Sequence, residues 1–350
     1  MKRRNVLALL TATALGASLL SGCGQAVSSS NAQEPQKESV LETTTTESEA
    51  KSETTEKWPT DTLEIITPDS TGTGVDLRAR ILAPYLEKEL GTTVIVTSKS
   101  GGGSTLCSQA LMDAKNDGST MMFTHNAFVA TKIWGTVDFD HRDAELISNL
   151  FSDDSIIICA GATSGLKSME DVTTKLEADP ESVTTVCDLG SIMYLCASSL
   201  GDAMGVKFGR VDAGGVTERI ATVVGGHADT VILQLASVMS YIESGELVPL
   251  AVLGDERLDS LPDVPTLKDL GYDWSWPDSL TAAFFPPETD PALVARMDEA
   301  LKNVVENPDF ITEVEAAEGV DFTDYQSTEE AKETWEELRE VLEAAYVLIQ

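Results

Sequence analysis

The sequence predicts an α/β fold built from two lobes. Short runs rich in β-branched residues alternate with helix-like stretches, and this alternation occurs in two separate blocks. The β-α-β-α-β order of each block indicates a parallel sheet with helices on both faces. The foldable part, about residues 58–350, also exceeds the size of one typical hydrophobic core. Two compact domains are therefore expected.

The elements of the first block follow from local signals. Gly91 suits the position just after a helix, and Asn116-Asp117-Gly118 is a turn signal. The expected elements are a strand at 63–67, a helix at 75–90, a strand at 94–97, a helix at 105–114 and a strand at 120–124.

The second block repeats the alternation. Its expected strands are 155–160, 183–187, 205–211, 229–233 and 248–253, and its expected helices are 169–178, 191–204 and 217–224. Two amphipathic helices, 291–306 and 328–348, follow. If they pack back on the first lobe, domain 1 comprises 58–160 and 282–350, and domain 2 comprises 161–281. Two chain crossings between lobes are typical of a hinge.

The N-terminus predicts export and lipid anchoring. Three basic residues precede an apolar run too short for a comfortable membrane span, so 1–22 is expected to be a signal peptide. The run ends in Leu20-Ser21-Gly22-Cys23, which suits lipoprotein processing with acyl chains such as palmitate on Cys23. An ordinary secretory signal is the alternative. Residues 23–57 are polar and poor in large apolar groups, so we expect a flexible acidic tether that holds an extracytoplasmic domain at the membrane.

Charge and cysteine content exclude several classes. A net charge of -34 argues against nucleic acid and anionic lipid surfaces as partners. No CxxC pair occurs, which disfavours a zinc or thiol-redox site. The cysteines other than Cys23 lie in apolar surroundings and are expected to be buried free thiols, with one or two disulfides as the alternative: Cys107, Cys159, Cys187 and Cys196.

Two glycine-rich turns carry most of the functional information. Each follows a strand-like run and begins a helix-like run, at 70–76 and at 100–104. Glycine lets the backbone approach a ligand closely, and a helix N-terminus offers free N–H groups. The two turns together predict a pocket for a small anion.

The order and spacing of several motifs resemble the extracytoplasmic solute receptors of tripartite tricarboxylate transporters, the Bug-type receptors. The similarity runs from about Trp58 to beyond Ala300. The motifs are the first turn with Asp76 and Ala79-Arg80, the Ser98–Ser104 turn, Asn116–Thr120, Gly225–Asp229, and Leu261–Thr266 preceded by Arg257.

This resemblance implies a two-lobed, periplasmic-binding-protein-like fold of type II, with a cleft that binds a small carboxylate through backbone N–H groups. It also implies a membrane permease as partner. The implied ligand-binding residues are Ser70, Thr71, Gly72, Thr73, Gly74, Asp76, Ser100, Gly101, Gly102, Gly103, Ser104, Thr124, His125, Asn126, Gly190, Ser191, Gln234 and Ser237. The chain departs from the family pattern at Asp69, at Ser70-Thr71, at Ala213–Gly215 and at Leu233, so the identity of the carboxylate stays open.

Individual residues leave alternatives open. Asp76 either fixes the first turn or is an ordinary helix-start charge paired with Arg80. His125 has no partner at metal-ligand spacing, so no metal and no cofactor are expected. No dinucleotide, phosphate-loop or nucleophile-elbow motif is present, and the protein is expected not to be an enzyme and to be monomeric. A secreted hydrolase-like enzyme and a sensory or partner-binding module are the rival interpretations.

Overall fold

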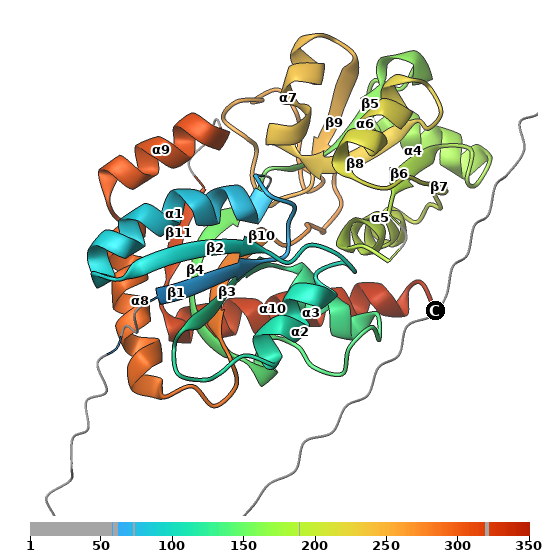
Figure 1. Ribbon diagram of the computed structural model, residues 1–350. Helices are drawn as coiled ribbons and strands as arrows, with labels where there is room; N and C mark the ends of the chain where they lie inside the picture. The colour runs from blue at the N-terminus through green and yellow to red at the C-terminus, as the bar shows by residue number, and fades with distance from the viewer. Residues whose placement is uncertain (1–57, 59–61, 73, 189, 319–321) are drawn as a thin grey trace, which may run out of the picture. The chain divides into compact units, whose positions relative to one another are not determined.

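The computed structural model describes residues 58, 62–72, 74–188, 190–318 and 322–350. The predicted signal peptide, the tether with Cys23, and Thr73 lie outside the described residues. The described chain forms an α/β structure with two separate sheets, each covered by helices (Figure 1). The two-lobed α/β prediction is therefore confirmed.

The first sheet has six strands in the order β11-β4-β10-β3-β1-β2. Its strands are β1 (Thr62–Thr67), β2 (Thr93–Ser98), β3 (Thr120–His125), β4 (Glu145–Asp153), β10 (Ser279–Phe285) and β11 (Thr323–Gln326). β1 is parallel to β2 and β3, as predicted. The sheet as a whole is mixed, because β10 runs antiparallel between β3 and β4.

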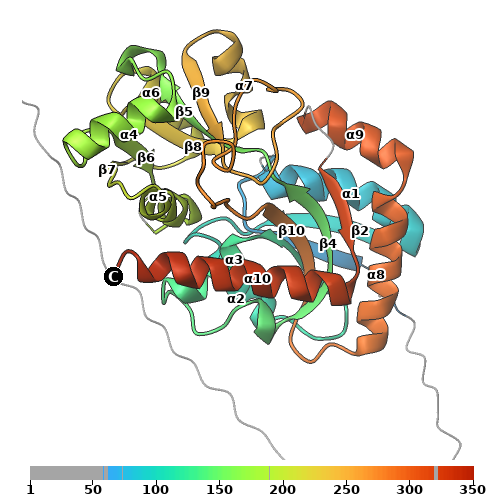
Figure 2. The same ribbon diagram turned by 180° about the vertical axis from the view of Figure 1, so that it is seen from behind.

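Strand periodicity explains how this sheet is buried. Leu63 and Ile65 face one apolar cluster, whereas Ile66 faces the other. The helices of the first cluster are α1 (Gly74–Leu90), α8 (Pro291–Val305) and α9 (Pro308–Glu318). The opposite face carries α2 (Thr105–Met112), α3 (Ala127–Ile133) and α10 (Thr328–Val347), as Figures 1 and 2 show.

The second sheet has five strands in the order β7-β6-β8-β5-β9. The strands are β5 (Ile156–Gly161), β6 (Thr184–Cys187), β7 (Gly209–Asp212), β8 (Thr230–Gln234) and β9 (Leu247–Val252). Its helices are α4 (Met169–Ala178) and α5 (Ile192–Ala203) on one face, and α6 (Val216–Val224) and α7 (Leu235–Glu243) on the other. This sheet is also mixed, because β5 is antiparallel to β8 and β9.

The chain crosses between the sheets twice. The first crossing lies between Asp153 and Ile156, since β5 already pairs within the second sheet. The return precedes Ser279, where β10 enters the first sheet. Both crossings thus fall a few residues before the expected limits at 160 and 281; treating the sheets as separate domains stays a prediction. One apolar cluster continues from α10 into α5, so the C-terminal helix packs on both lobes (Figure 2).

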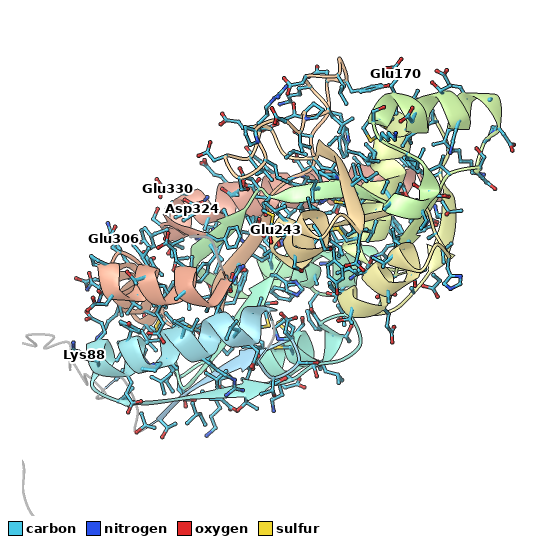
Figure 3. All side chains as sticks on the ribbon, turned by 90° about the horizontal axis from the view of Figure 1, so that it is seen from above. Lys88, Glu170, Glu243, Glu306, Asp324 and Glu330 are labelled. Carbon is cyan, nitrogen blue, oxygen red and sulfur yellow. The ribbon has the colours of Figure 1, made fainter. Side chains whose placement is uncertain are left out.

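The acidic residues lie mainly on the surface. Glu170, Glu243 and Glu306 are exposed on different elements (Figure 3). The four cysteines Cys107, Cys159, Cys187 and Cys196 are buried and free, which confirms the thiol prediction. Across the described residues, we find no helix with the length and apolarity needed to cross a bilayer.

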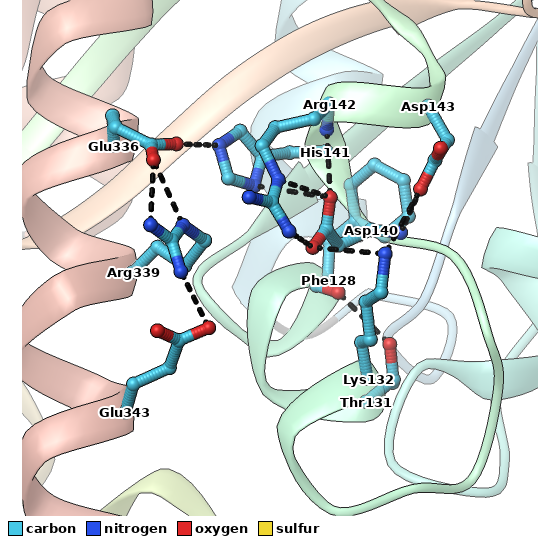
Figure 4. Close-up of polar contacts among 10 residues, drawn as sticks. All are labelled: Phe128, Thr131, Lys132, Asp140, His141, Arg142, Asp143, Glu336, Arg339 and Glu343. Atoms are coloured by element: carbon cyan, nitrogen blue, oxygen red, sulfur yellow. Dashed lines mark hydrogen bonds and ion pairs between the residues drawn. The ribbon is translucent and has the colours of Figure 1, made fainter.

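A charged network joins α10 to the short 3-10 helix His141–Asp143 (Figure 4). Asp140 is 2% exposed and accepts from the Arg142 backbone N–H at 3.0 Å and from Arg142 Nη2 at 2.7 Å. His141 is also buried, and its Nε2 lies 3.5 Å from Glu336 Oε2. A buried carboxylate and a buried imidazole therefore lie side by side in the first lobe.

We expect this network to make the fold lose stability in acid. Burial lowers the pKa of His141 from 6.5, against the opposing charges of Asp140 and Glu336, so below pH 6.5 the unfolded chain binds this proton more readily. Burial alone would raise the pKa of Asp140, but Arg142 and neighbouring cations hold it at about 2. Asp140 therefore contributes about 2 kcal/mol above pH 3.8, and this contribution is lost as the pH falls toward 2.

Urea unfolding between pH 7 and pH 3 tests this expectation. His141→Gln should flatten the loss of stability below pH 6.5, and Asp140→Asn should flatten the loss below pH 4, relative to the wild-type protein. His227→Gln, at an exposed position, serves as the matched control. Unchanged slopes in both network variants would contradict the assignment.

Candidate functional site

The first turn, between β1 and α1, is held by two aspartates. Asp76 is fully buried and accepts from the Gly72 N–H at 2.6 Å and from Thr67 Oγ1 at 3.0 Å. Asp69 accepts from the Val75 N–H at 2.7 Å. The amides of Gly72 and Val75 therefore already have acceptors within the protein, contrary to the expectation that this turn offers its amides to a ligand.

Asp76 also pairs with Arg80, whose Nε lies 2.7 Å and Nη2 3.1 Å from its carboxylate. Burial alone would raise the pKa of Asp76, but the bonds from Arg80, Gly72 and Thr67 lower it below 3.8. Both sequence interpretations of Asp76 thus describe real contacts. The carboxylate fixes the turn, and the helix-start ion pair is present.

The second turn, between β2 and α2, has a different backbone. Four successive residues have positive φ: Gly101 (131°), Gly102 (61°), Gly103 (59°) and Ser104 (80°). Within the described residues, no protein group accepts a hydrogen bond from the amides of Ser100–Ser104. Successive unpaired amides in such a conformation form an anion-binding concavity.

The two turns adjoin, as predicted. β1 and β2 are parallel neighbours that end together, with Thr67 opposite Ser98. The Lys99 N–H donates to the Thr67 carbonyl at 2.8 Å, and the Ser98 hydroxyl donates to the Asp69 carbonyl. The carboxyl ends of parallel strands therefore bring both turns to one edge of the sheet, where ligands bind in open α/β folds.

A cleft of about 730 Å³ lies between this edge and the second lobe. The predicted site residues that line it are Ser70, Ser100, Gly101, Gly102, Gly103, Ser104, His125, Asn126, Gly190, Ser191 and Gln234. An adjoining space of about 660 Å³ adds Gly74 and Ser237. The two spaces share Asp69, His125, Arg219, Gln234 and Ser279, so we describe them as two branches of one cleft.

Several predicted residues lie elsewhere or make other contacts. Thr71, Gly72, Asp76 and Thr124 line neither branch. Asn126 lines the cleft, but its side chain donates to the Asp278 carbonyl at 2.9 Å and accepts from the Leu280 N–H at 2.8 Å. It thereby ties the end of β3 to the second crossing. The remaining predicted contacts stay predictions.

Local hydrogen bonds orient two further cleft residues. His125 Nδ1 accepts from the Ala127 N–H at 3.1 Å, which leaves the proton on Nε2, 3.3 Å from Asp69 Oδ1. Ser191 caps α5 by accepting from the Tyr194 N–H at 3.3 Å. Hydrogen bonds within the protein thus fix the orientation of both side chains.

Among the charged cleft residues that the sequence analysis missed, Asp69 and Arg219 line both branches. Burial alone would raise the pKa of Asp69, but His125, Val75 and Arg78 lower it, so an ionised carboxylate stands in the cleft. Arg219 on α6 faces the same space. In the sequence, Asp69 has the pattern of a turn residue and Arg219 that of a cation on the exposed face of a helix. Neither pattern predicts a position in the cleft.

The cleft also has an apolar wall. Trp276 is 3% exposed and lines it together with side chains from both lobes: Trp134, Ile156, Ile192, Met193 and Leu233. This combination of an apolar wall and few polar groups is typical of small-molecule sites.

Comparison with known proteins decides the family. A family model described as "Tripartite tricarboxylate transporter family receptor" matches residues 78–342. The chain belongs to this receptor family. A UPF0065 protein from the gbd 5' region of Cupriavidus necator is 30% identical over 264 residues, which cover 73% of this chain and 78% of that protein. The Bordetella pertussis protein BugT is 23% identical, with 75% and 81% covered.

Solved structures share the fold. A TctC solute-binding protein from Polaromonas superposes with a TM-score of 0.70 at 21% identity, covering 84% of this chain and 99% of that one. The R. palustris protein Rpa4515 with adipate gives 0.72 at 18% identity, covering 83% and 98%. The chain is thus a Bug-type solute-binding receptor, and its homologues are receptors rather than enzymes.

Proposed function

We propose that this receptor captures a small carboxylate in its cleft and delivers it to the membrane subunits of a tripartite tricarboxylate transporter. The observation that carries the proposal is the Ser100–Ser104 turn, whose five amides have no acceptor among the described residues and whose residues all line the cleft. Oriented amides attract an anion without requiring a cation in the site. The adipate in the neighbour from R. palustris supports the carboxylate class.

A thermal-shift screen of carboxylates, followed by calorimetry, tests the function. Each acid is paired with its primary amide, which has the same shape but no charge. We expect at least one carboxylate to bind saturably and to raise the melting temperature, while its amide does neither. Equal binding of acid and amide, or no binding by any acid, would contradict the proposal.

We further propose that the receptor is extracytoplasmic and held to the membrane by acyl chains on Cys23. The position of Cys23 directly after the apolar run supports this. Several acyl chains on one residue give stable anchoring, since each buried CH₂ contributes about 0.8 kcal/mol.

Mass spectrometry of the mature protein should show an N-terminal acylated Cys23. Cys23→Ser should remove the acyl mass and the protein from the washed membrane fraction, whereas Cys107→Ser, at a buried thiol, should leave both unchanged. A mature protein with a free thiol at Cys23, or with a different first residue, would contradict lipid anchoring.

A further inference from the structure

Arg219 is a half-buried cation on α6. Its Nε and Nη1 atoms are buried and have no hydrogen-bond acceptor among the residues that the structure describes. No carboxylate in the described part of the chain forms an ion pair with it. Burying guanidinium N–H groups without an acceptor is unfavourable, so the position of Arg219 needs an explanation.

The surroundings compensate this charge only weakly. Burial lowers the pKa of Arg219 from 12.5, and the nearby Asp188 and Cys187 oppose that shift. Asp188 also lines the cleft, but burial raises the pKa of its own carboxyl despite Arg219. The guanidinium is nevertheless charged at neutral pH, because its ordinary pKa is so high. The cleft thus contains a positive charge that forms no ion pair with a described residue, in a chain of net charge -34.

The first lobe's cleft arginine, Arg78, shows the contrast. Its Nε and Nη2 lie 2.8 Å and 2.7 Å from the Glu318 carboxylate, and its Nη1 donates to Thr281 Oγ1 at 3.2 Å. The centre of the Phe151 ring also lies 5.0 Å from the guanidinium carbon of Arg78. Arg78 is therefore fully paired within the protein, whereas Arg219 is available to a ligand.

The position of Arg219 separates it from the anion-binding turn. Arg219 lines both branches of the cleft, whereas Ser100–Ser104 line only the larger branch. The nearby negative charge of Asp69 already has donors in Val75 and His125. A ligand that places one anionic group at the turn can therefore present a second one to the guanidinium from the opposite lobe.

We propose that Arg219 is a second anion-binding subsite, contributed by the second lobe, and that it selects ligands with two carboxylates over ligands with one. A guanidinium binds a carboxylate through two parallel hydrogen bonds, which gives both strength and orientation. Contacts to both lobes also favour closure, because only a ligand with greater affinity for the closed form can shift the equilibrium. This inference rests on the proposed carboxylate function of the same cleft.

The experiment compares Arg219→Gln and Arg219→Lys with the wild-type protein. The control is Arg210→Gln, which removes a charge from the same lobe at an exposed residue that lines neither branch. The probes are linear dicarboxylates from malonate to adipate, each matched with the monocarboxylate of equal carbon number. Calorimetry gives the affinities, and thermal denaturation without ligand gives the stability.

We expect the wild-type protein to bind its best dicarboxylate about 100-fold more tightly than the matched monocarboxylate. Arg219→Gln should weaken dicarboxylate binding about 100-fold and change monocarboxylate binding less than threefold. Arg219→Lys should be intermediate, and Arg210→Gln should match the wild-type protein. The ligand-free Arg219→Gln protein should melt at the same or a higher temperature, because the variant removes a charged group whose buried Nε and Nη1 atoms have no acceptor among the described residues.

The outcomes separate this inference from the proposed function. If the wild-type protein binds carboxylates and Arg219→Gln retains the same preference for two charges, only the role of Arg219 is overturned. A lower melting temperature of ligand-free Arg219→Gln, with both ligand classes weakened alike, would assign a structural role instead and also overturn it. If no carboxylate binds the wild-type protein, the proposed function itself fails.

Discussion

Replacing Gly102 with valine should abolish ligand binding while the protein stays folded. Gly102 has φ +61°, and a Cβ there would meet Thr105 Cβ at 3.2 Å. A β-branched residue disfavours this backbone conformation by about 1–3 kcal/mol, so the turn should move and its amides should no longer converge. We expect carboxylate affinity to fall at least about 100-fold by calorimetry, because hydrogen bonds to a charged group are among the strong ones.

The matched control is Gly91→Val. Gly91 has a similar φ of +67° at the end of α1, and a Cβ there meets nothing within 4 Å. The control should lose a comparable free energy of unfolding in urea, because valine strains the backbone at both positions. It should still bind the ligand like the wild-type protein. Unchanged carboxylate affinity in Gly102→Val, or an equal loss of affinity in Gly91→Val, would contradict the binding role assigned to the turn.

Local signals explain what the sequence could predict. The expected helix at 75–90 and strand at 94–97 match α1 and β2 within one residue at each end, because apolar periodicity and Gly91 act over short distances. The glycines at 101–103 likewise require only local backbone freedom, and their turn lines the cleft. Adjacent parallel strands then bring the two turns together.

Long-range pairing explains what the sequence could not predict. β10 lies between β3 and β4, although more than 100 residues separate it from either strand along the chain. No local pattern encodes that antiparallel pairing, so a purely parallel sheet was expected. The same limit applies to Asn126, because its amide becomes a tie to the second crossing only after β10 has entered the sheet.

Side-chain burial is set by the same long-range arrangement. Arg219 follows Glu218 on an amphipathic helix, where a cation is typical of a solvated face. The burial of its Nε and Nη1 atoms, with no acceptor among the described residues, depends on where α6 packs in the second lobe. Asp69 is comparable, since its place in the cleft depends on His125, 56 residues away, in the neighbouring strand.

Removing the Asp76 carboxylate should destabilise the fold and weaken ligand binding together. Asp76→Ala removes the acceptor of the Gly72 N–H and of the hydroxyl of the buried Thr67, and one buried unsatisfied group costs about 1–3 kcal/mol. We expect a loss of about 3 kcal/mol in urea unfolding. Carboxylate affinity should fall about tenfold or more, because Ser70 and Asp69, which line the cleft, belong to the turn that Asp76 holds.

The pH dependence of this variant follows from the direction of the pKa shift. Since the folded-state pKa of Asp76 lies below 3.8, its stabilisation is present above that pH and is lost as the pH falls. Asp76→Ala should therefore lose less stability than the wild-type protein between pH 5 and pH 3.

Arg80→Gln separates the ion pair from the turn. Arg80 is 40% exposed on its side chain, so losing its charge should cost at most about 1 kcal/mol. The Asp76 carboxylate would still accept from Gly72 and Thr67, and ligand affinity should stay at the wild-type level. If Arg80→Gln instead reproduced both losses of Asp76→Ala, the helix-start ion pair would be the important contact. The bonds from Asp76 to the turn would then have no part in positioning the cleft.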